Sequence, residues 1–181
     1  MLAGALKGQR LITARGRATR PTGDRVRIAC LDTLMPYLGG GPFLDLFAGV
    51  GAVGIEALSR GAPSAVFVEL DAHALRALRG NVARLGLGER ARVMRDDVAR
   101  AVDTLGRRGE RFAVVFLDPP YASPRAAPAL AAVSAGGVLA AAAVVALQHP
   151  TKSPPEALGV LSVWKTRRFG ETTLTFFRSP A

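Results

Sequence analysis

The stretch Asp45-Leu-Phe-Ala-Gly-Val-Gly-Ala-Val-Gly54 decides the fold of this chain of 181 residues. It continues a short apolar run that begins at Phe43, and the residues after it, 52–58, have the composition of a helix. Its three glycines form the pattern G-x-G-x-x-G, which allows a tight turn and lets the backbone approach a nucleotide ligand closely. The stretch therefore predicts a strand, a ligand-binding loop and a helix in succession.

The order of strand and helix continues along the rest of the chain. Five short apolar runs are expected to form strands, at 43–47, 65–69, 91–94, 112–117 and 144–147. Helices are expected at 22–38, 52–58 and 73–85. Strand–helix alternation at this spacing predicts an α/β fold, with a mostly parallel sheet and helices on both faces. Two further strands around Gly170, at 160–165 and 174–177, predict an antiparallel hairpin at the carboxyl end.

One uncharged stretch, 126–147, has the length of a transmembrane helix. Pro128 and the pair Gly136-Gly137 interrupt it, so a short helix, a turn and a buried strand are the better interpretation. The single cysteine, Cys30, cannot form an internal disulfide, and residues 1–10 contain no long apolar run. We therefore expect a cytoplasmic protein that does not span a membrane, with Cys30 as a small buried side chain.

The formal net charge of +10 is concentrated at the two ends of the chain. Residues 1–30 contain seven lysines and arginines against one acid, residues 151–181 contain five against two, and residues 31–150 contain twelve against eleven. A neutral centre with basic ends predicts a catalytic domain whose flanks bind a polyanion, although a solvated basic surface is the alternative. Basic residues alternate with small or apolar ones before residue 20, which predicts a basic β-hairpin extension at 1–20 and a catalytic domain at 21–181.

The glycine pattern admits more than one ligand. Glu69 lies twenty residues after Gly49, at the end of the next expected strand, where an acid can bind two ribose hydroxyls. A nicotinamide dinucleotide and S-adenosylmethionine both fit, and a turn that serves packing only is the third interpretation. Asp45 favours S-adenosylmethionine, because a pyrophosphate site disfavours negative charge whereas a carboxylate suits a sulfonium and an amino group.

The motif Asp118-Pro-Pro-Tyr121 follows the expected strand 112–117, so it lies beside the ligand site. An aromatic amino group is a poor nucleophile because its lone pair is delocalised into the ring. Hydrogen bonds from both amino hydrogens to the Asp118 carboxylate and the Pro119 carbonyl favour a more tetrahedral nitrogen. The two prolines stiffen the backbone, and Tyr121 offers a face on which an extruded base can stack. The alternative is a tight loop in which these residues only shape a turn.

Over nearly its whole length the chain resembles the bacterial RsmD family of methyltransferases. The matching stretches are 3–4, 7–11, 20–27, 45–54, 56–61, 69–71 and 118–121. Arg20-Pro-Thr-Gly-Asp-Arg-Val-Arg27 is the most family-specific of them. This chain departs from the family's usual sequence at Val50, where the family has a small serine, and at residues 28–32. The resemblance implies a class I methyltransferase fold, S-adenosylmethionine as cofactor, and methylation of guanine N2 in 16S ribosomal RNA.

The resemblance also implies that Glu69 binds the cofactor ribose and that Asp97 binds the adenine amino group. Together with the motifs, it predicts these cofactor-binding residues: Asp45, Phe47, Gly49, Gly51, Gly54, Glu69, Leu70, Asp97 and Val98. The predicted catalytic residues are Asp118, Pro119, Pro120 and Tyr121. The predicted RNA-binding residues are Lys7, Arg10, Arg15, Arg17, Arg20, Thr22 and Arg25. The expected partner is ribosomal RNA or the small ribosomal subunit, and the expected oligomeric state is a monomer.

Other function classes stay open at this point. The Asp-Pro-Pro-Tyr motif also suits a methyltransferase acting on DNA bases or on a glutamine side chain. A non-catalytic RNA-binding assembly factor with the same fold is a second alternative, and an NAD-linked oxidoreductase is a remote third. His73 and His149 are far apart along the chain and form no metal-ligand pattern, so we expect no metal. Trp164 is expected to pack within the carboxyl-terminal hairpin, and a platform on which a base stacks is the alternative.

Overall fold

The computed structural model describes residues 1, 3–13, 21–120 and 125–181, without the side chains of residues 21 and 22. It contains one sheet with the strand order β3-β2-β1-β4-β5-β7-β6. The strands are β1 Phe43–Leu46, β2 Ala65–Glu69, β3 Ala91–Arg95, β4 Phe112–Leu117, β5 Leu139–Pro150, β6 Ser162–Phe169 and β7 Thr172–Arg178. Strands β1 to β5 pair in parallel, and β7 pairs antiparallel with both β5 and β6. The predicted α/β fold and its carboxyl-terminal hairpin are confirmed.

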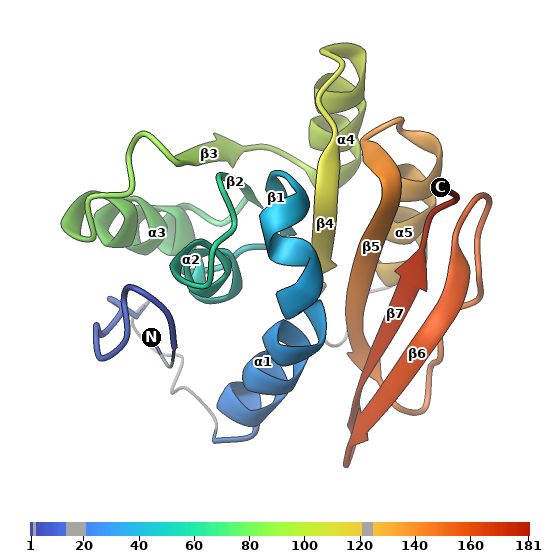
Figure 1. The fold of residues 1–181 in the computed structure, drawn as a ribbon, viewed down its shortest axis with the longest axis horizontal. Helices are drawn as coiled ribbons and strands as arrows, with labels where there is room; N and C mark the ends of the chain where they lie inside the picture. Colours follow the sequence, from blue (N-terminus) through green and yellow to red (C-terminus); the bar gives the residue numbers. More distant parts are fainter. Residues whose placement is uncertain (2, 14–20, 121–124) are drawn as a thin grey trace.

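Helices cover both faces of this sheet (Figure 1). They are α1 Pro21–Leu34, α2 Ala52–Ser59, α3 Ala72–Arg84, α4 Val98–Arg107 and α5 Ala126–Ala135, with a short 3-10 helix at Met35–Gly40. Side chains of α1, α2 and α3 join one apolar cluster on one face, and those of α4 and α5 join another on the opposite face. Strands β1, β2, β4, β5 and β7 supply residues to both clusters, as Phe43 and Leu44 of β1 do, because successive side chains of a strand point to opposite faces.

The uncharged stretch folds as the sequence indicates. Helix α5 ends at Ala135, Gly137 turns the chain at φ 61°, and β5 follows as a largely buried strand. Among the described residues, none of the helices combines the length and the apolar character needed to cross a membrane. The expected helix at 22–38 is shorter than predicted, because Pro36 lacks a backbone N–H and the chain continues from Met35 as a 3-10 helix.

Helix α4 is an element that the strand–helix pattern did not predict. Its apolar residues Val98, Ala101, Val102 and Leu105 are buried and recur at the helical spacing, and its amino end is capped by a side chain. The cap is Asp97, whose carboxylate accepts a hydrogen bond from the N–H of Ala99 at 3.0 Å. The signal for this helix was therefore present in the sequence.

The amino-terminal segment differs from the prediction. Residues 3–8 form bends and turns, residues 9–13 have no regular secondary structure, and none of residues 1 and 3–13 lies in a strand, so the predicted β-hairpin is wrong for these residues. The reason is that their backbone groups bind helix α2 instead of another strand. The N–H of Ala3 donates to the Glu56 carboxylate at 2.8 Å, and the N–H of Leu6 donates to the Ser59 hydroxyl at 2.9 Å. The division of the chain at residue 20 stays a prediction.

Candidate functional site

The carboxyl ends of β1, β2 and β4 bring the predicted site residues to one edge of the sheet. Leu46 at the end of β1 pairs with Val68 on one side and with Leu117 on the other. The first residue after β4, Asp118, donates its N–H to the Leu46 carbonyl at 3.4 Å. The glycine loop (residues 47–51, between β1 and α2) and the Asp118 motif (residues 118–121, after β4) are therefore neighbours, as ligand sites in parallel sheets require.

The glycine loop is a left-handed turn held by backbone hydrogen bonds. Phe47, Gly49 and Gly51 have φ of 63°, 57° and 84°, and the N–H of Gly51 donates to the Ala48 carbonyl at 2.8 Å. The positive φ of Phe47 is strained for a residue with a side chain, and such strain is often found at binding sites. Helix α2 begins directly after the loop, so its first N–H groups lie beside it.

We expect Gly51→Ala to destabilise the protein more than Gly49→Ala. Both substitutions place a side chain at positive φ, at a cost of about 1–2 kcal/mol. A Cβ at residue 51 would also lie 2.4 Å from Leu78 Cδ1, whereas a Cβ at residue 49 meets nothing within 4 Å. Overpacking adds about 1–3 kcal/mol to the loss for Gly51→Ala alone. Urea unfolding of both variants checks this, and equal losses would contradict it.

Glu69, at the end of β2, ties the glycine loop to the neighbouring strand. Its Oε2 accepts a hydrogen bond from the N–H of Gly49 at 2.7 Å, and its Oε1 accepts from Leu70 and Asp71 at 2.8 Å each. A carboxylate has about four acceptor positions, so one remains for a ligand hydroxyl. Leu70, next to it, is 49% exposed. The structure therefore gives Glu69 a second role, in holding the loop, that the motif did not indicate.

Asp45 lies behind the glycine loop. It is 1% exposed, and its Oδ2 accepts a hydrogen bond from the N–H of Gly54 at 2.8 Å. The pKa of Asp45 is raised from 3.8 to about 7: burial is the largest cause, the Gly54 hydrogen bond acts against it, and the charges of Asp118 and Glu69 contribute to the rise. The structure thus shows Asp45 fixing the start of α2, while its contact with a cofactor stays a prediction.

The raised pKa of Asp45 predicts a pH-dependent stability. Between pH 4 and 7 the folded state holds a proton on Asp45 that the unfolded state has released, because the pKa is about 7 when folded and 3.8 otherwise. The free energy of unfolding therefore falls as pH rises through this window, by a few kcal/mol from this group. Asp45→Asn keeps an oxygen acceptor for Gly54 and removes the titration. Urea unfolding at pH 5 and pH 8 should show a smaller decrease for the variant than for the unaltered protein, and an equal decrease would contradict it.

Asp97 and Val98 lie where β3 leads into α4. Asp97 caps the helix, and its own N–H donates to the Asp96 carboxylate at 2.8 Å, while Val98 is buried in the core. Because β3 is next to β2 in the sheet, this turn lies at the same edge as Glu69. The structure shows the capping role, and contact with an adenine stays a prediction for both residues.

The described part of the Asp118 motif alternates between exposed and buried positions. Asp118 and Pro120 are exposed, and Pro119 is buried. The charge of Asp118 also acts on helix α1: together with burial, which is the larger cause, it raises the pKa of the Cys30 thiol. Helix α1, which carries Cys30, covers the front of the sheet (Figure 1). Tyr121 lies outside the described residues.

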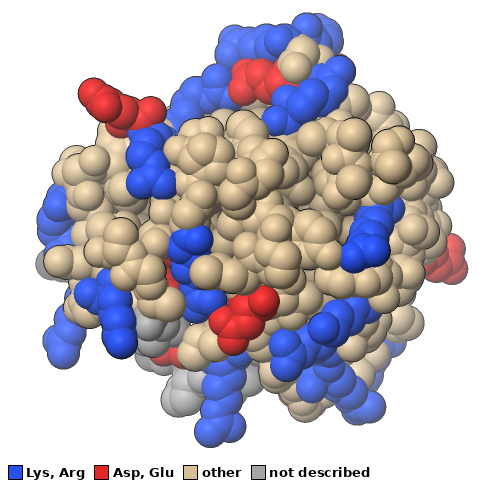
Figure 2. Space-filling model, viewed as in Figure 1, with Lys and Arg blue, Asp and Glu red and all other residues tan. Residues whose placement is uncertain are grey.

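The predicted RNA-binding residues are partly described. Lys7 and Arg10 are exposed on the amino-terminal segment, and Arg25 is exposed on α1. Arg15, Arg17, Arg20 and the side chain of Thr22 lie outside the described residues. Figure 2 shows lysines and arginines over the lower part of this face and also at its top; in the same view, Figure 1 places the carboxyl ends of β4 and β5 towards the lower part and α4 at the top. The basic surface is thus broader than the predicted set.

The carboxyl-terminal hairpin contains an aromatic and basic cluster. Trp164 packs edge-on against Tyr37 and Phe176, with ring centroids 5.7 and 6.3 Å apart. The Arg178 guanidinium lies 4.1 Å from the centroid of Trp164 and donates a hydrogen bond to the Tyr37 hydroxyl at 2.7 Å. The expected packing role of Trp164 is therefore confirmed.

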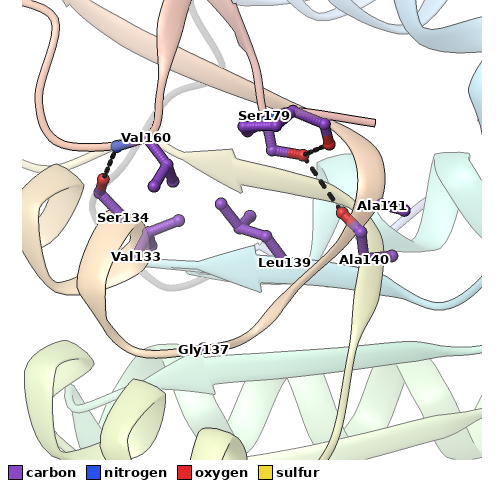
Figure 3. Close-up of a pocket in the computed structure, with 9 residues that line it drawn as sticks. Val133, Ser134, Gly137, Leu139, Ala140, Ala141, Val160 and Ser179 are labelled. Carbon is purple, nitrogen blue, oxygen red and sulfur yellow. Dashed lines mark hydrogen bonds between the residues drawn. The ribbon is translucent and has the colours of Figure 1, made fainter.

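A separate apolar pocket of about 250 Å³ lies away from this site (Figure 3). Its lining comes mainly from the end of α5, the start of β5 and the carboxyl terminus, and includes Val133, Leu139 and Val160. The start of β5 is at the amino ends of the parallel strands, opposite to Asp118.

The part of the chain that the structure describes has no group of three or more histidine, cysteine, aspartate or glutamate residues that could hold a metal ion.

Sequence reasoning missed one residue at the site. Asn81 of α3 is fully buried, and its amide donates a hydrogen bond to the carbonyl of Val50 in the glycine loop at 3.0 Å. A lone asparagine in a helix has no motif around it. The available signal was a polar residue at a position where the helical pattern expects an apolar one.

The sheet order and the site at its carboxyl edge define the fold of the class I methyltransferases. A family model described as "Conserved hypothetical protein 95" matches residues 1–178. This chain belongs to that family, the RsmD family.

Known proteins support the assignment along most of the chain. A Bacillus subtilis protein named "Putative rRNA methyltransferase YlbH" is 34% identical over 179 residues, which cover 98% of this chain and 97% of that protein. "Ribosomal RNA small subunit methyltransferase D" of Haemophilus influenzae is 39% identical over 124 residues, 67% of this chain and 63% of its own length. The solved structure of the Thermus thermophilus hypothetical protein TTHA0928 has a TM-score of 0.81 at 37% identity, covering 97% of this chain and 96% of the other.

Proposed function

We propose that this protein transfers the methyl group of S-adenosylmethionine to the exocyclic N2 of a guanine in small-subunit ribosomal RNA. The observation that carries the proposal is the direct contact between the two motifs. The backbone of Asp118 is bonded to Leu46, one residue before the glycine loop begins, so a base at Asp118 lies next to a cofactor at that loop. The names of the relatives from Bacillus subtilis and Haemophilus influenzae support ribosomal RNA as the substrate.

The residues present fit S-adenosylmethionine. The space beside Gly49 is open where a Cβ would be, and Glu69 keeps an acceptor position for a ribose hydroxyl. In this assignment Leu70, Asp97 and Val98 surround the adenine, and Asp45, Phe47, Gly51 and Gly54 shape the loop around the rest of the cofactor. When bound, S-adenosylmethionine supplies a methyl group on a positively charged sulfur, which an amino nitrogen can attack.

The chain's own contribution to the reaction is to prepare the amino group. The exposed Asp118 carboxylate and the Pro119 carbonyl accept hydrogen bonds from the two amino hydrogens, which directs the nitrogen lone pair towards the methyl group. Pro119 and Pro120 keep the backbone rigid, so little reorganisation is needed when the base arrives. Tyr121 is assigned the stacking of the extruded base.

The basic residues are assigned to the RNA backbone. Lys7, Arg10 and Arg25 are exposed, and Arg15, Arg17, Arg20 and Thr22 complete the proposed set. Such contacts give affinity and position but little sequence information. The proposal places the protein in the cytoplasm, as a monomer without a metal, acting on ribosomal RNA or on the small subunit.

A single experiment tests the reaction. The protein is incubated with methyl-labelled S-adenosylmethionine and undermethylated small ribosomal subunits, and the RNA is then digested to nucleosides. We expect the label in N2-methylguanosine. Label in another nucleoside would contradict the target atom, whereas label in DNA or in a protein glutamine under matched conditions would favour one of the two other methyl acceptors. An absence of label on every substrate would favour the assembly-factor alternative.

A further inference from the structure

Asn81 connects the amino-terminal segment (residues 3–13) to the glycine loop. Its Oδ1 accepts a hydrogen bond from the N–H of Ile12 at 2.6 Å, and its Nδ2 donates to the Ile12 carbonyl at 3.1 Å. The same Nδ2 donates to the Val50 carbonyl at 3.0 Å. Because Asn81 is fully buried, losing any of these bonds would leave a polar group without a partner away from water. One rigid amide therefore holds both segments at once.

The two segments that Asn81 joins have different assignments. Val50 lies between Gly49 and Gly51, at the centre of the loop that faces the proposed cofactor. Ile12 lies two residues after Arg10, in the segment that carries exposed basic residues. Ile12 itself is 46% exposed, so its backbone bonds to Asn81 do more than its side chain to hold this part of the segment in place.

We propose that Asn81 is a positioning residue that couples RNA binding to cofactor binding. RNA held by Lys7 and Arg10 stabilises the segment around Ile12 in the conformation whose backbone bonds to Asn81, and Asn81 in that orientation holds the Val50 carbonyl. The glycine loop then already has the conformation that binds the cofactor, so each ligand raises the affinity of the protein for the other. Thermodynamic linkage requires the effect to be equal in both directions. The inference rests on the proposed function, since it needs both ligands.

The segment has a second anchor, which provides a matched control. The Ser59 hydroxyl accepts from the N–H of Leu6 and donates to the Ala3 carbonyl at 2.6 Å. Ser59 is at the end of α2, so it holds the same segment as Asn81 does but does not bond to the glycine loop. Loss of this anchor loosens the segment without cutting the connection between Ile12 and Val50.

Three variants separate the coupling from general destabilisation. Asn81→Ala removes the whole connection. Ile12→Pro removes the N–H that donates to Asn81, at a residue whose side chain is half exposed, and leaves the bond between Asn81 and Val50 in place. Ser59→Ala removes the other anchor. The affinity for S-adenosylhomocysteine is measured by calorimetry for each full-length variant, with and without saturating 16S ribosomal RNA, after urea unfolding has shown that the variant is folded.

In the unaltered protein we expect RNA to raise the affinity for S-adenosylhomocysteine about fivefold or more, which is the usual lower range of such coupling. Ile12→Pro should keep the RNA-free affinity within about twofold and lose the enhancement, and Asn81→Ala should lose both. Ser59→Ala should retain the enhancement. Full enhancement in Ile12→Pro would overturn the inference and leave the proposed function intact. A protein that binds neither ligand would instead overturn the proposed function.

Discussion

Asp118→Ala is expected to lower the rate of methyl transfer by a factor of 30 or more, with little change in RNA binding. The carboxylate is assigned to accept a hydrogen bond that strengthens as the amino nitrogen becomes tetrahedral, so its loss raises the barrier by at least about 2–3 kcal/mol. The side chain is exposed, and the backbone contact of Asp118 with Leu46 is kept in the variant. Folding should therefore be nearly unchanged. Single-turnover rates with saturating RNA and cofactor are the direct measurement.

Two further variants define the chemical reason for the loss. Asp118→Asn keeps one oxygen acceptor for the amino group, so it should retain more activity than Asp118→Ala. Asp103→Ala is the matched control, because Asp103 is an exposed carboxylate on α4 that pairs with Arg107. This control should have normal activity. A near-normal single-turnover rate for Asp118→Ala would remove the motif from the mechanism.

Glu69→Ala is expected to weaken binding of S-adenosylmethionine and S-adenosylhomocysteine by about 2–4 kcal/mol. A ribose hydroxyl loses an ionised acceptor, and hydrogen bonds to charged groups are the stronger kind. The structure adds a second cost, since the N–H of Gly49 also loses its partner and the glycine loop is freed from β2. Calorimetry with each ligand measures the combined effect.

Glu69→Gln separates the two contributions. The amide oxygen can still accept from Gly49, but the amide nitrogen cannot accept from Leu70 and Asp71, so binding should fall less than in Glu69→Ala. Glu110→Ala is the control. Glu110 pairs with Arg92 near the amino ends of the parallel strands, opposite to the site, so this substitution should not affect cofactor binding. Unchanged cofactor affinity in Glu69→Ala would contradict the assignment of the site.

Local pattern was sufficient to place the elements that form the site. Strands β2 and β4 have the predicted bounds, since short apolar runs between turn residues are strong signals for buried parallel strands. The register of such strands brings their carboxyl ends together, so the glycine loop, Glu69 and Asp118 could be assigned to one edge from their positions in the chain alone. The turns at Gly49 and Gly51 were equally predictable, because positive φ favours glycine.

Tertiary contacts decided what the local pattern did not. The alternation of basic and small residues at the amino end suits a strand, yet residues 3–13 contain none, and hydrogen bonds to Glu56 and Ser59 hold the turns at residues 3–8. The burial of Asp45 and its hydrogen bond from the N–H of Gly54 were not predicted, while its contact with a cofactor stays a prediction. Asn81 has no motif, and its role exists only because the fold brings Ile12 and Val50 to the same amide. The amino-terminal segment and Asn81 bind partners that are 31 to 69 residues away in the chain, so no local propensity records these contacts.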